Sequence, residues 1–245
     1  SCKSAYNSIL AQTPQAVIIG PTFIHETQEI CSKLDAANIP YLFVDSIIEE
    51  TRPITTFTTD HYASGFLLGR LLHSLCGGEG SIAIFRALRT GNERASTSLE
   101  RRRGFMDYMI RAKFNHRIKE STFSVLTPEE NEKEILNFIQ NNPDIQGIAI
   151  MNSRGYIIAD ILRNHGINHI QIISFDLTSN NIRCIENGSI TALLCQRPEL
   201  QGFNAIKAMI QYLLYNRNVS ETHHMMPIDI IMKENLPYYQ EDKTI

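Results

Sequence analysis

The sequence predicts an α/β protein built on parallel sheets, and three observations lead to this expectation. Runs of β-branched and other apolar residues alternate with stretches whose apolar residues recur at helical spacing. The apolar runs are continuous, as in strands that are buried on both faces of a parallel sheet. The alternation continues along all 245 residues, further than one compact sheet of about 150 residues requires. Two α/β lobes and one large doubly wound domain both accommodate this number of units.

The first half of the chain carries the expected elements in regular order. Each expected strand is a cluster of β-branched and other apolar residues, and each expected helix has an apolar stripe such as Ile30 and Leu34. Gly20 and Pro21 end the first strand, since both residues disrupt regular structure. The expected strands are residues 16–19, 41–44, 55–59 and 81–85. The expected helices are residues 25–37 and 62–75.

The second half repeats this order. Thr127 and Glu130 have the spacing of a capping box, with Pro128 at the first helical position, so a helix is expected to begin there. The other expected helices are residues 101–111, 156–164, 180–187 and 199–215. The expected strands are residues 147–151, 170–174, 190–194 and 228–232.

Polar side chains follow several of the expected strands. They are Asp45, Asp60, Asn152, Asp176 and Gln196. In open α/β sheets ligands bind beyond the carboxyl ends of the strands. Carboxylates and carboxamides, with the guanidinium of Arg101 near a helix start, are the groups that hold hydroxyl-rich ligands. Each residue alone is better explained as a helix cap, but the set favours a ligand site.

Composition and charge exclude several classes of protein. The net charge is −3 and charged residues make up 20% of the chain, without the clustered basic charge of a nucleic-acid surface. The triplet 101–103 is interpreted as one inward Arg and two solvated ones. No apolar run approaches the roughly 18 residues of a membrane span. The five scattered cysteines form no close pair, which favours reduced thiols in a cytoplasmic protein.

No catalytic or metal-binding pattern is present in the sequence. There is no GxSxG elbow, HExxH pair or phosphate-binding glycine loop. His223 and His224 are interpreted as part of a surface loop and not as a metal site. We therefore expect neither an enzyme nor a cofactor, and no metal.

Longer motifs carry a resemblance to a known family. Residues 173–178 (ISFDLT) and 192–202 (ALLCQRPELQG), together with the Arg-x-x-Gly-Phe pattern of residues 101–105, resemble LacI/GalR regulators. The strand 149–152 ending in Asn, and the Asp and glycines of residues 60–69, are similar to the same family. The related type I periplasmic sugar-binding proteins share these features, and the likeness covers nearly the whole chain.

The resemblance implies two doubly wound, Rossmann-like lobes with parallel sheets, joined by three crossings, with the ligand in the cleft between them. The N-terminal lobe would comprise residues 1–86 plus 197–226, and the C-terminal lobe residues 87–196 plus 227–245. Residues 1–12 already correspond to the family's second helix, so the first strand and helix have no counterpart. DNA would be bound only through an N-terminal helix-turn-helix that the sequence does not include.

The resemblance also implies the ligand contacts and the function. The implied ligand-binding residues are Asp60, Thr97, Arg101, Asn152, Asp176 and Gln196, with Asp45 as a secondary candidate. The expected ligand is a neutral sugar, because the three aspartates would repel an anion. The expected function is effector sensing in a homodimeric bacterial LacI-type regulator, with lobe closure coupled to DNA binding. The alternative is a secreted sugar-binding protein of a transporter or sensor system.

Overall fold

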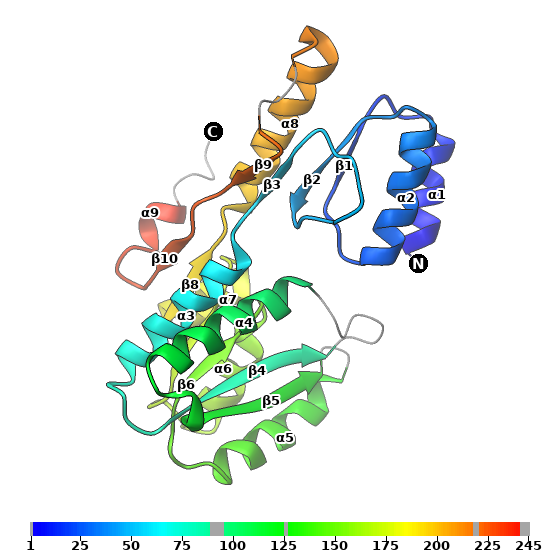
Figure 1. The fold of residues 1–245 in the computed structure, drawn as a ribbon. Coiled ribbons are helices and arrows are strands. Elements are labelled where there is room, and N and C mark those ends of the chain that lie inside the picture. Colours follow the sequence, from blue (N-terminus) through cyan, green and yellow to red (C-terminus); the bar gives the residue numbers. More distant parts are fainter. Residues whose placement is uncertain (1, 89–95, 125–126, 218–220, 241–245) are drawn as a thin grey trace. The chain divides into compact units, whose positions relative to one another are not determined.

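The computed structural model describes residues 2–88, 96–124, 127–217 and 221–240 (Figure 1). The chain forms two compact units. Unit 1 comprises Ser1–Asp60 and Arg197–Pro227, and unit 2 comprises His61–Gln196 and Ile228–Ile245. Each unit is an α/β sandwich with its own sheet and its own core, because each sheet buries apolar side chains on both faces.

Unit 1 is built on a four-stranded parallel sheet with the strand order β1-β2-β3-β9. The strands are β1 (Val17–Ile19), β2 (Tyr41–Asp45), β3 (Thr56–Thr58) and β9 (His223–Met225). The helices are α1 (Cys2–Ala11), α2 (Ile24–Ala36) and α8 (Pro198–Tyr215). Successive side chains of β2 point to opposite faces. Tyr41 and Phe43 pack with α1 and α2, and Leu42 packs against α8.

Unit 2 is built on a six-stranded sheet with the order β10-β8-β7-β6-β4-β5. The strands are β4 (Ser81–Leu88), β5 (Ile118–Ser124), β6 (Ile145–Ile150), β7 (Gln171–Phe175), β8 (Ala192–Cys195) and β10 (Asp229–Ile231). Its strands pair in parallel, except that β10 is antiparallel to β8. The sequence-based expectation of parallel pairing was therefore wrong for β10.

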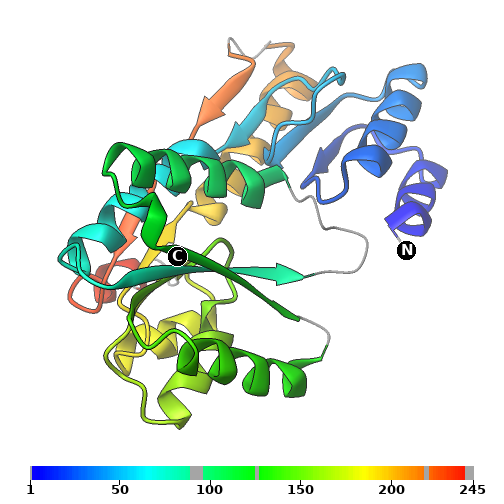
Figure 2. The same cartoon turned by 60° about the horizontal axis from the view of Figure 1, so that its bottom comes forward.

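Helices cover both faces of the unit 2 sheet (Figure 2). One face packs against α3 (His61–Leu75) and α4 (Ser96–Arg111). The other face packs against α5 (Pro128–Gln140), α6 (Gly155–Asn164) and α7 (Ser179–Glu186). A short 3-10 helix, Asn115–Arg117, precedes β5, and α9 (Pro237–Gln240) follows β10. In the described ranges, no helix is both long enough and apolar enough to cross a bilayer.

The helices α3 and α4 approach each other backbone to backbone. A Cβ on Gly65 would overlap the carbonyl oxygen of Arg101, and a Cβ on Gly104 would overlap the carbonyl oxygen of Tyr62. Only glycine permits such close contact. The contact fixes the position of Arg101 on α4.

The predicted fold class, α/β with two parallel-sheet lobes, is confirmed. The predicted division of the chain differs from the structure over residues 61–86 and at residue 227. This segment was assigned to the N-terminal lobe, but α3 packs on α4, and β4 pairs with β5 and β6 in unit 2. The first crossing therefore follows Asp60. The reason is tertiary, since the glycine contact with α4 and the pairing of β4 involve residues far along the chain.

Two strands were missed, and the interpretation of His223 and His224 as a loop was wrong. These histidines lie in β9, which pairs with β3 at the end of the sheet. The strand β5, at an end of the other sheet, has only two apolar residues, Ile118 and Phe123. An edge strand is held by backbone hydrogen bonds to one neighbouring strand, so it can form with few apolar side chains.

Candidate ligand-binding site

Three predicted site residues lie at one edge of the unit 2 sheet. Asn152, Asp176 and Gln196 follow β6, β7 and β8, which are parallel neighbours. Because the carboxyl ends of parallel neighbours meet at one edge, the topology brings residues from distant parts of the chain together.

A chain of hydrogen bonds joins this edge to α4. The Arg101 guanidinium donates from Nη1 to the carbonyl oxygen of Met151 at 2.8 Å and from Nη2 to Oε1 of Gln196 at 2.8 Å. The amide of Gln196 in turn donates from Nε2 to both carboxylate oxygens of Asp176, at 3.1 and 3.2 Å. Gln196 therefore bridges the cation and the carboxylate, accepting from one and donating to the other.

Burial strengthens these contacts. Arg101 and Gln196 are each only 5% exposed. The Arg101 Cζ lies 3.8 Å from the centroid of the Phe175 ring, so the aromatic face also stabilises the buried charge. Asp176 is half-buried and keeps part of its surface accessible. A ligand at this edge would meet a partly accessible carboxylate whose position is held by buried neighbours.

The turn after β7 is held in an unusual conformation. Asp176 has φ 61°, in the left-handed region that Asp tolerates better than most residues. The side chain of Asn181 donates to the carbonyl oxygens of Phe175 and Asp176 at 2.9 and 3.1 Å. Sequence reasoning missed Asn181, although its place three residues after Thr178, the N-cap of α7, was a usable signal.

Asn152 and Thr97 are placed differently. The side chain of Asn152 accepts the backbone N–H of Arg154 at 2.9 Å, which forms an Asx turn just before α6 begins. Its carbonyl oxygen accepts from the hydroxyl of Ser174 at 2.7 Å. Thr97 lies one helical turn before Arg101 on α4, so the two share a face of the helix.

The two remaining candidates belong to unit 1. Asp45 ends β2 with φ 74°, and its backbone N–H donates to Oε1 of Gln201 at 3.0 Å. Asp60 is exposed and lies just beyond the carboxyl end of β3. Gln201, which is 3% exposed in the first turn of α8, also donates to Thr59 at 3.5 Å. Sequence analysis quoted the segment containing Gln201 but did not single it out.

The structure thus joins Arg101 to Asp176 through Gln196 in unit 2, with Asn152 at the same edge and Thr97 on the face of α4 that carries Arg101. Asp45 and Asp60 lie at the carboxyl ends of the unit 1 strands. In the described ranges, no group of three or more His, Cys, Asp and Glu side chains is placed to hold a metal ion. A carboxylate, a carboxamide and a guanidinium at one edge can donate to and accept from hydroxyl groups.

Two α/β units with polar residues at the carboxyl ends of their strands define a two-lobed binding protein. Residues 3–217 match the model of the periplasmic binding protein domain family, and the chain belongs to this family.

Three individual relatives each share less than 30% sequence identity with this chain. The chain is 23% identical over 226 residues to the ribose import binding protein RbsB of Bacillus subtilis, covering 89% of this chain and 69% of the relative. A Bacteroides fragilis protein assigned as a LacI transcriptional regulator has a similar structure, with a TM-score of 0.91 and 29% identity, covering 96% of this chain and 81% of that one. A tagatose-bound solute binding protein of Agrobacterium vitis has a TM-score of 0.81 and 20% identity, covering 96% of this chain and 80% of that one. This likeness supports the fold alone.

Proposed function

We propose that this chain is the ligand-sensing domain of a LacI-type transcriptional regulator, and that its effector is a small, neutral, sugar-like molecule. The observation that carries the proposal is the Arg101–Gln196–Asp176 network at the carboxyl ends of adjacent strands. Asn152 and Thr97 would add contacts from unit 2, and Asp60 and Asp45 would add contacts from unit 1.

The chemistry of these residues supports a polyhydroxylated ligand. Asp176 can accept from two hydroxyl groups, while neighbouring donors orient the ring oxygens. Carboxylates at three of the proposed contact positions disfavour an anionic ligand. The names of relatives point the same way, since RbsB is a ribose import protein and the Agrobacterium vitis protein binds tagatose.

The likeness to the Bacteroides fragilis protein favours a regulator. Cys31, Cys184 and Cys195 are buried and not joined in disulfides, and burial raises the pKa of Cys31 to about 11. Free thiols suit the reducing cytoplasm. The likeness to RbsB favours the second candidate function, a secreted sugar-binding protein of a transporter.

Gln196 suggests how binding would be transmitted. It bonds both Arg101 and Asp176 and is the last residue of unit 2 before the crossing at Arg197. A ligand that contacts this network would bias the arrangement of the units, and a DNA-binding segment of the parent chain would respond. A nearly complete shift needs roughly 5.5 kcal/mol of differential affinity. Two to four hydrogen bonds to charged groups supply about this much, at about 1.5–3 kcal/mol each.

The binding proposal is tested by calorimetric titration and thermal unfolding with ribose, allose, tagatose and arabinose. A sugar at about 100 times its Kd should stabilise the chain by about 2.7 kcal/mol. Asp176→Asn should abolish the effect, because Asn keeps the left-handed turn but loses the charge. The matched control Asp160→Asn removes a carboxylate that pairs with Arg183 and accepts from the Cys184 thiol, neither of which is a proposed ligand contact. Binding that survives Asp176→Asn, or no binding of any sugar by folded protein, contradicts the proposal.

The choice between regulator and transporter protein is tested in the source cell. Fractionation should place the native protein in the cytoplasm, and deletion of its gene should change transcription of sugar-utilisation genes. Recovery from the periplasm, with unchanged transcription and impaired sugar uptake, would establish the second candidate function instead.

A further inference from the structure

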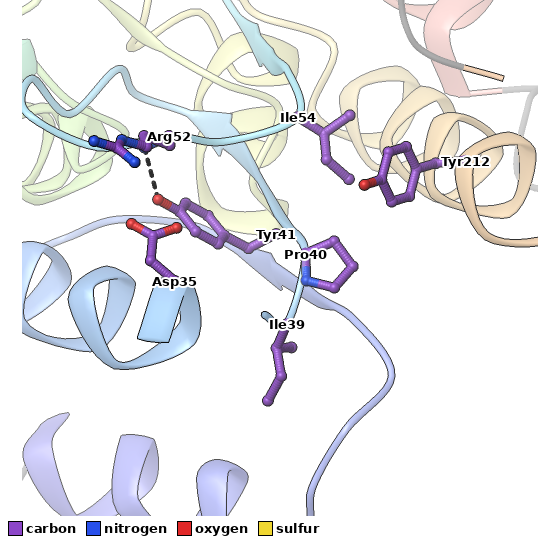
Figure 3. Close-up of a pocket in the computed structure, with 7 residues that line it drawn as sticks. All are labelled: Asp35, Ile39, Pro40, Tyr41, Arg52, Ile54 and Tyr212. Carbon is purple, nitrogen blue, oxygen red and sulfur yellow. Dashed lines mark hydrogen bonds between the residues drawn. The ribbon is translucent and has the colours of Figure 1, made fainter. Parts of the chain in front are cut away.

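Unit 1 contains a cavity of about 320 Å³ that lies apart from the carboxyl-end residues of its sheet (Figure 3). Tyr41, the first residue of β2, forms part of its lining, whereas Asp45 ends the same strand. The cavity is therefore at the amino end of the sheet. Its volume falls within the range of about 300–1,000 Å³ that is typical of small-molecule sites.

Hydrogen bonds between the lining segments hold the cavity in shape. The hydroxyl of Tyr41, a residue only 1% exposed, accepts the backbone N–H of Arg52 at 2.7 Å. The N–H of Ile54 donates to the carbonyl oxygen of Tyr41 at 2.8 Å, and that of Ile39 donates to Leu34 at 2.9 Å. The loop before β3 and the turn after α2 are thus tied to their neighbours, and the site is formed without a ligand.

The α2 side of the cavity carries a carboxylate, that of Asp35. Asp35 lies in the last turn of α2, where the carbonyl groups at the helix end already carry partial negative charge. An anion at this position is unfavourable for the helix. The nearby cation of the same turn, Lys33, lies 3.6 Å from Glu29. A ligand with a cationic group would be attracted to both Asp35 and the helix end.

The other groups of the cavity complete an amphipathic pattern. Figure 3 shows Arg52 and Asp35 on one side, with Ile54 and Tyr212 on the other and Pro40 between them. Hence one side offers a guanidinium and a carboxylate, and the other offers aliphatic surface and a phenol ring. A molecule that carries both charges at one end and an apolar group at the other matches this arrangement.

We propose that this cavity binds a free α-amino acid with an apolar side chain. Its ammonium group would lie at Asp35 and the carbonyl end of α2, and its carboxylate at the guanidinium of Arg52. Its side chain would rest on Pro40, Ile54 and the ring of Tyr212. This second ligand site shares no residue with the site proposed for the sugar-like effector, so either can fail without the other.

The test is calorimetric titration of the whole chain with L-leucine up to millimolar concentrations. We expect binding by the unaltered protein, weakened about tenfold or more by Asp35→Asn and by Arg52→Gln, since each removes one charge contact. Controls that make the same changes in unit 2, Asp160→Asn and Arg103→Gln, should bind leucine normally. Asp176→Asn should also bind it normally, which separates this site from the sugar site.

Two leucine analogues assign each contact. L-Leucine methyl ester lacks the carboxylate, so it should bind weakly and be indifferent to Arg52→Gln. 4-Methylpentanoate lacks the ammonium group, so it should bind weakly and be indifferent to Asp35→Asn. The proposal is overturned if leucine does not bind the folded protein, if both variants bind it normally, or if Asp176→Asn abolishes its binding.

Discussion

Arg101 illustrates how one residue can organise a site. Its charge is almost completely buried, and burial of a charge is tolerated only when partners compensate for it. The compensation comes from the carbonyl of Met151, the amide of Gln196 and the ring of Phe175. The interpretation of the basic triplet as one inward and two solvated residues is confirmed. Arg102 pairs with Glu120 on the surface, and the Arg103 side chain is 61% exposed.

Replacing Arg101 should therefore lower stability much more than replacing Arg103. Arg101→Met leaves the Met151 carbonyl and Gln196 Oε1 buried without their donor, at about 1–3 kcal/mol each. We expect the free energy of unfolding to fall by about 2–5 kcal/mol in urea titrations, against less than about 0.5 kcal/mol for Arg103→Met. Equal effects of the two substitutions would show that the buried network contributes no net stability.

At the scale of elements, the crossing of α3 and α4 positions Arg101. Gly65→Ala places a methyl group against the carbonyl of Arg101, so the helices must separate. We expect a loss of about 1–3 kcal/mol in the free energy of unfolding and weaker sugar binding.

Gly202→Ala on α8 is the matched control, because no atom lies within 4 Å of its added Cβ. It should stabilise the protein by about 0.5–1 kcal/mol through the better helix propensity of Ala. A stable Gly65→Ala variant would show that the two helices can move apart without cost.

The ion pair between Glu120 on β5 and Arg102 on α4 predicts that the free energy of unfolding depends on pH. Hydrogen bonding from Arg102 lowers the pKa of Glu120 in the folded protein. A lowered pKa stabilises the fold above the unfolded pKa of about 4.3, and the contribution disappears as pH falls through the folded pKa.

Urea unfolding of the unaltered protein and of Glu120→Gln measures this contribution. The variant should be less stable at neutral pH by up to about 1 kcal/mol, since the pair is partly exposed. The difference should shrink as pH falls below about 4.3 and vanish once the pH lies below the lowered pKa of Glu120 in the folded protein, where its carboxyl group is protonated. A difference that persists unchanged at low pH would rule out the ion pair as its source.

At the scale of the whole molecule, the two units differ in the size of their cores. Unit 2 buries two large apolar clusters on its six strands, whereas β1, β3 and β9 of unit 1 have three residues each. Hydrogen exchange should therefore be slower in β6 and β7 than in β1 and β9, by about tenfold or more. Equal protection of both sets would mean that the units unfold as one cooperative body.

Much of this architecture is encoded locally. The strand at residues 16–19 and the helix at 199–215 were predicted because continuous apolar runs and helical stripes are local patterns. The strands β5 and β9 were not predicted, because their polar side chains carry no such pattern and their pairing comes from the backbone. The assignment of residues 61–86 to a lobe was wrong because the packing of α3 against α4 joins distant parts of the chain and leaves no local pattern.

The sequence by itself determined the α/β class and the candidate residues Asp176, Gln196 and Arg101, because each stands next to a recognisable local element. Only the tertiary structure decided that Gln196 bonds to Arg101, 95 residues away, and to Asp176, 20 residues away. It also decided that the side chain of Asn152 holds the turn before α6 and that Gln201 bonds to the end of β2. The physical reason is that strand order and helix packing determine which side chains meet, and both depend on contacts between distant segments.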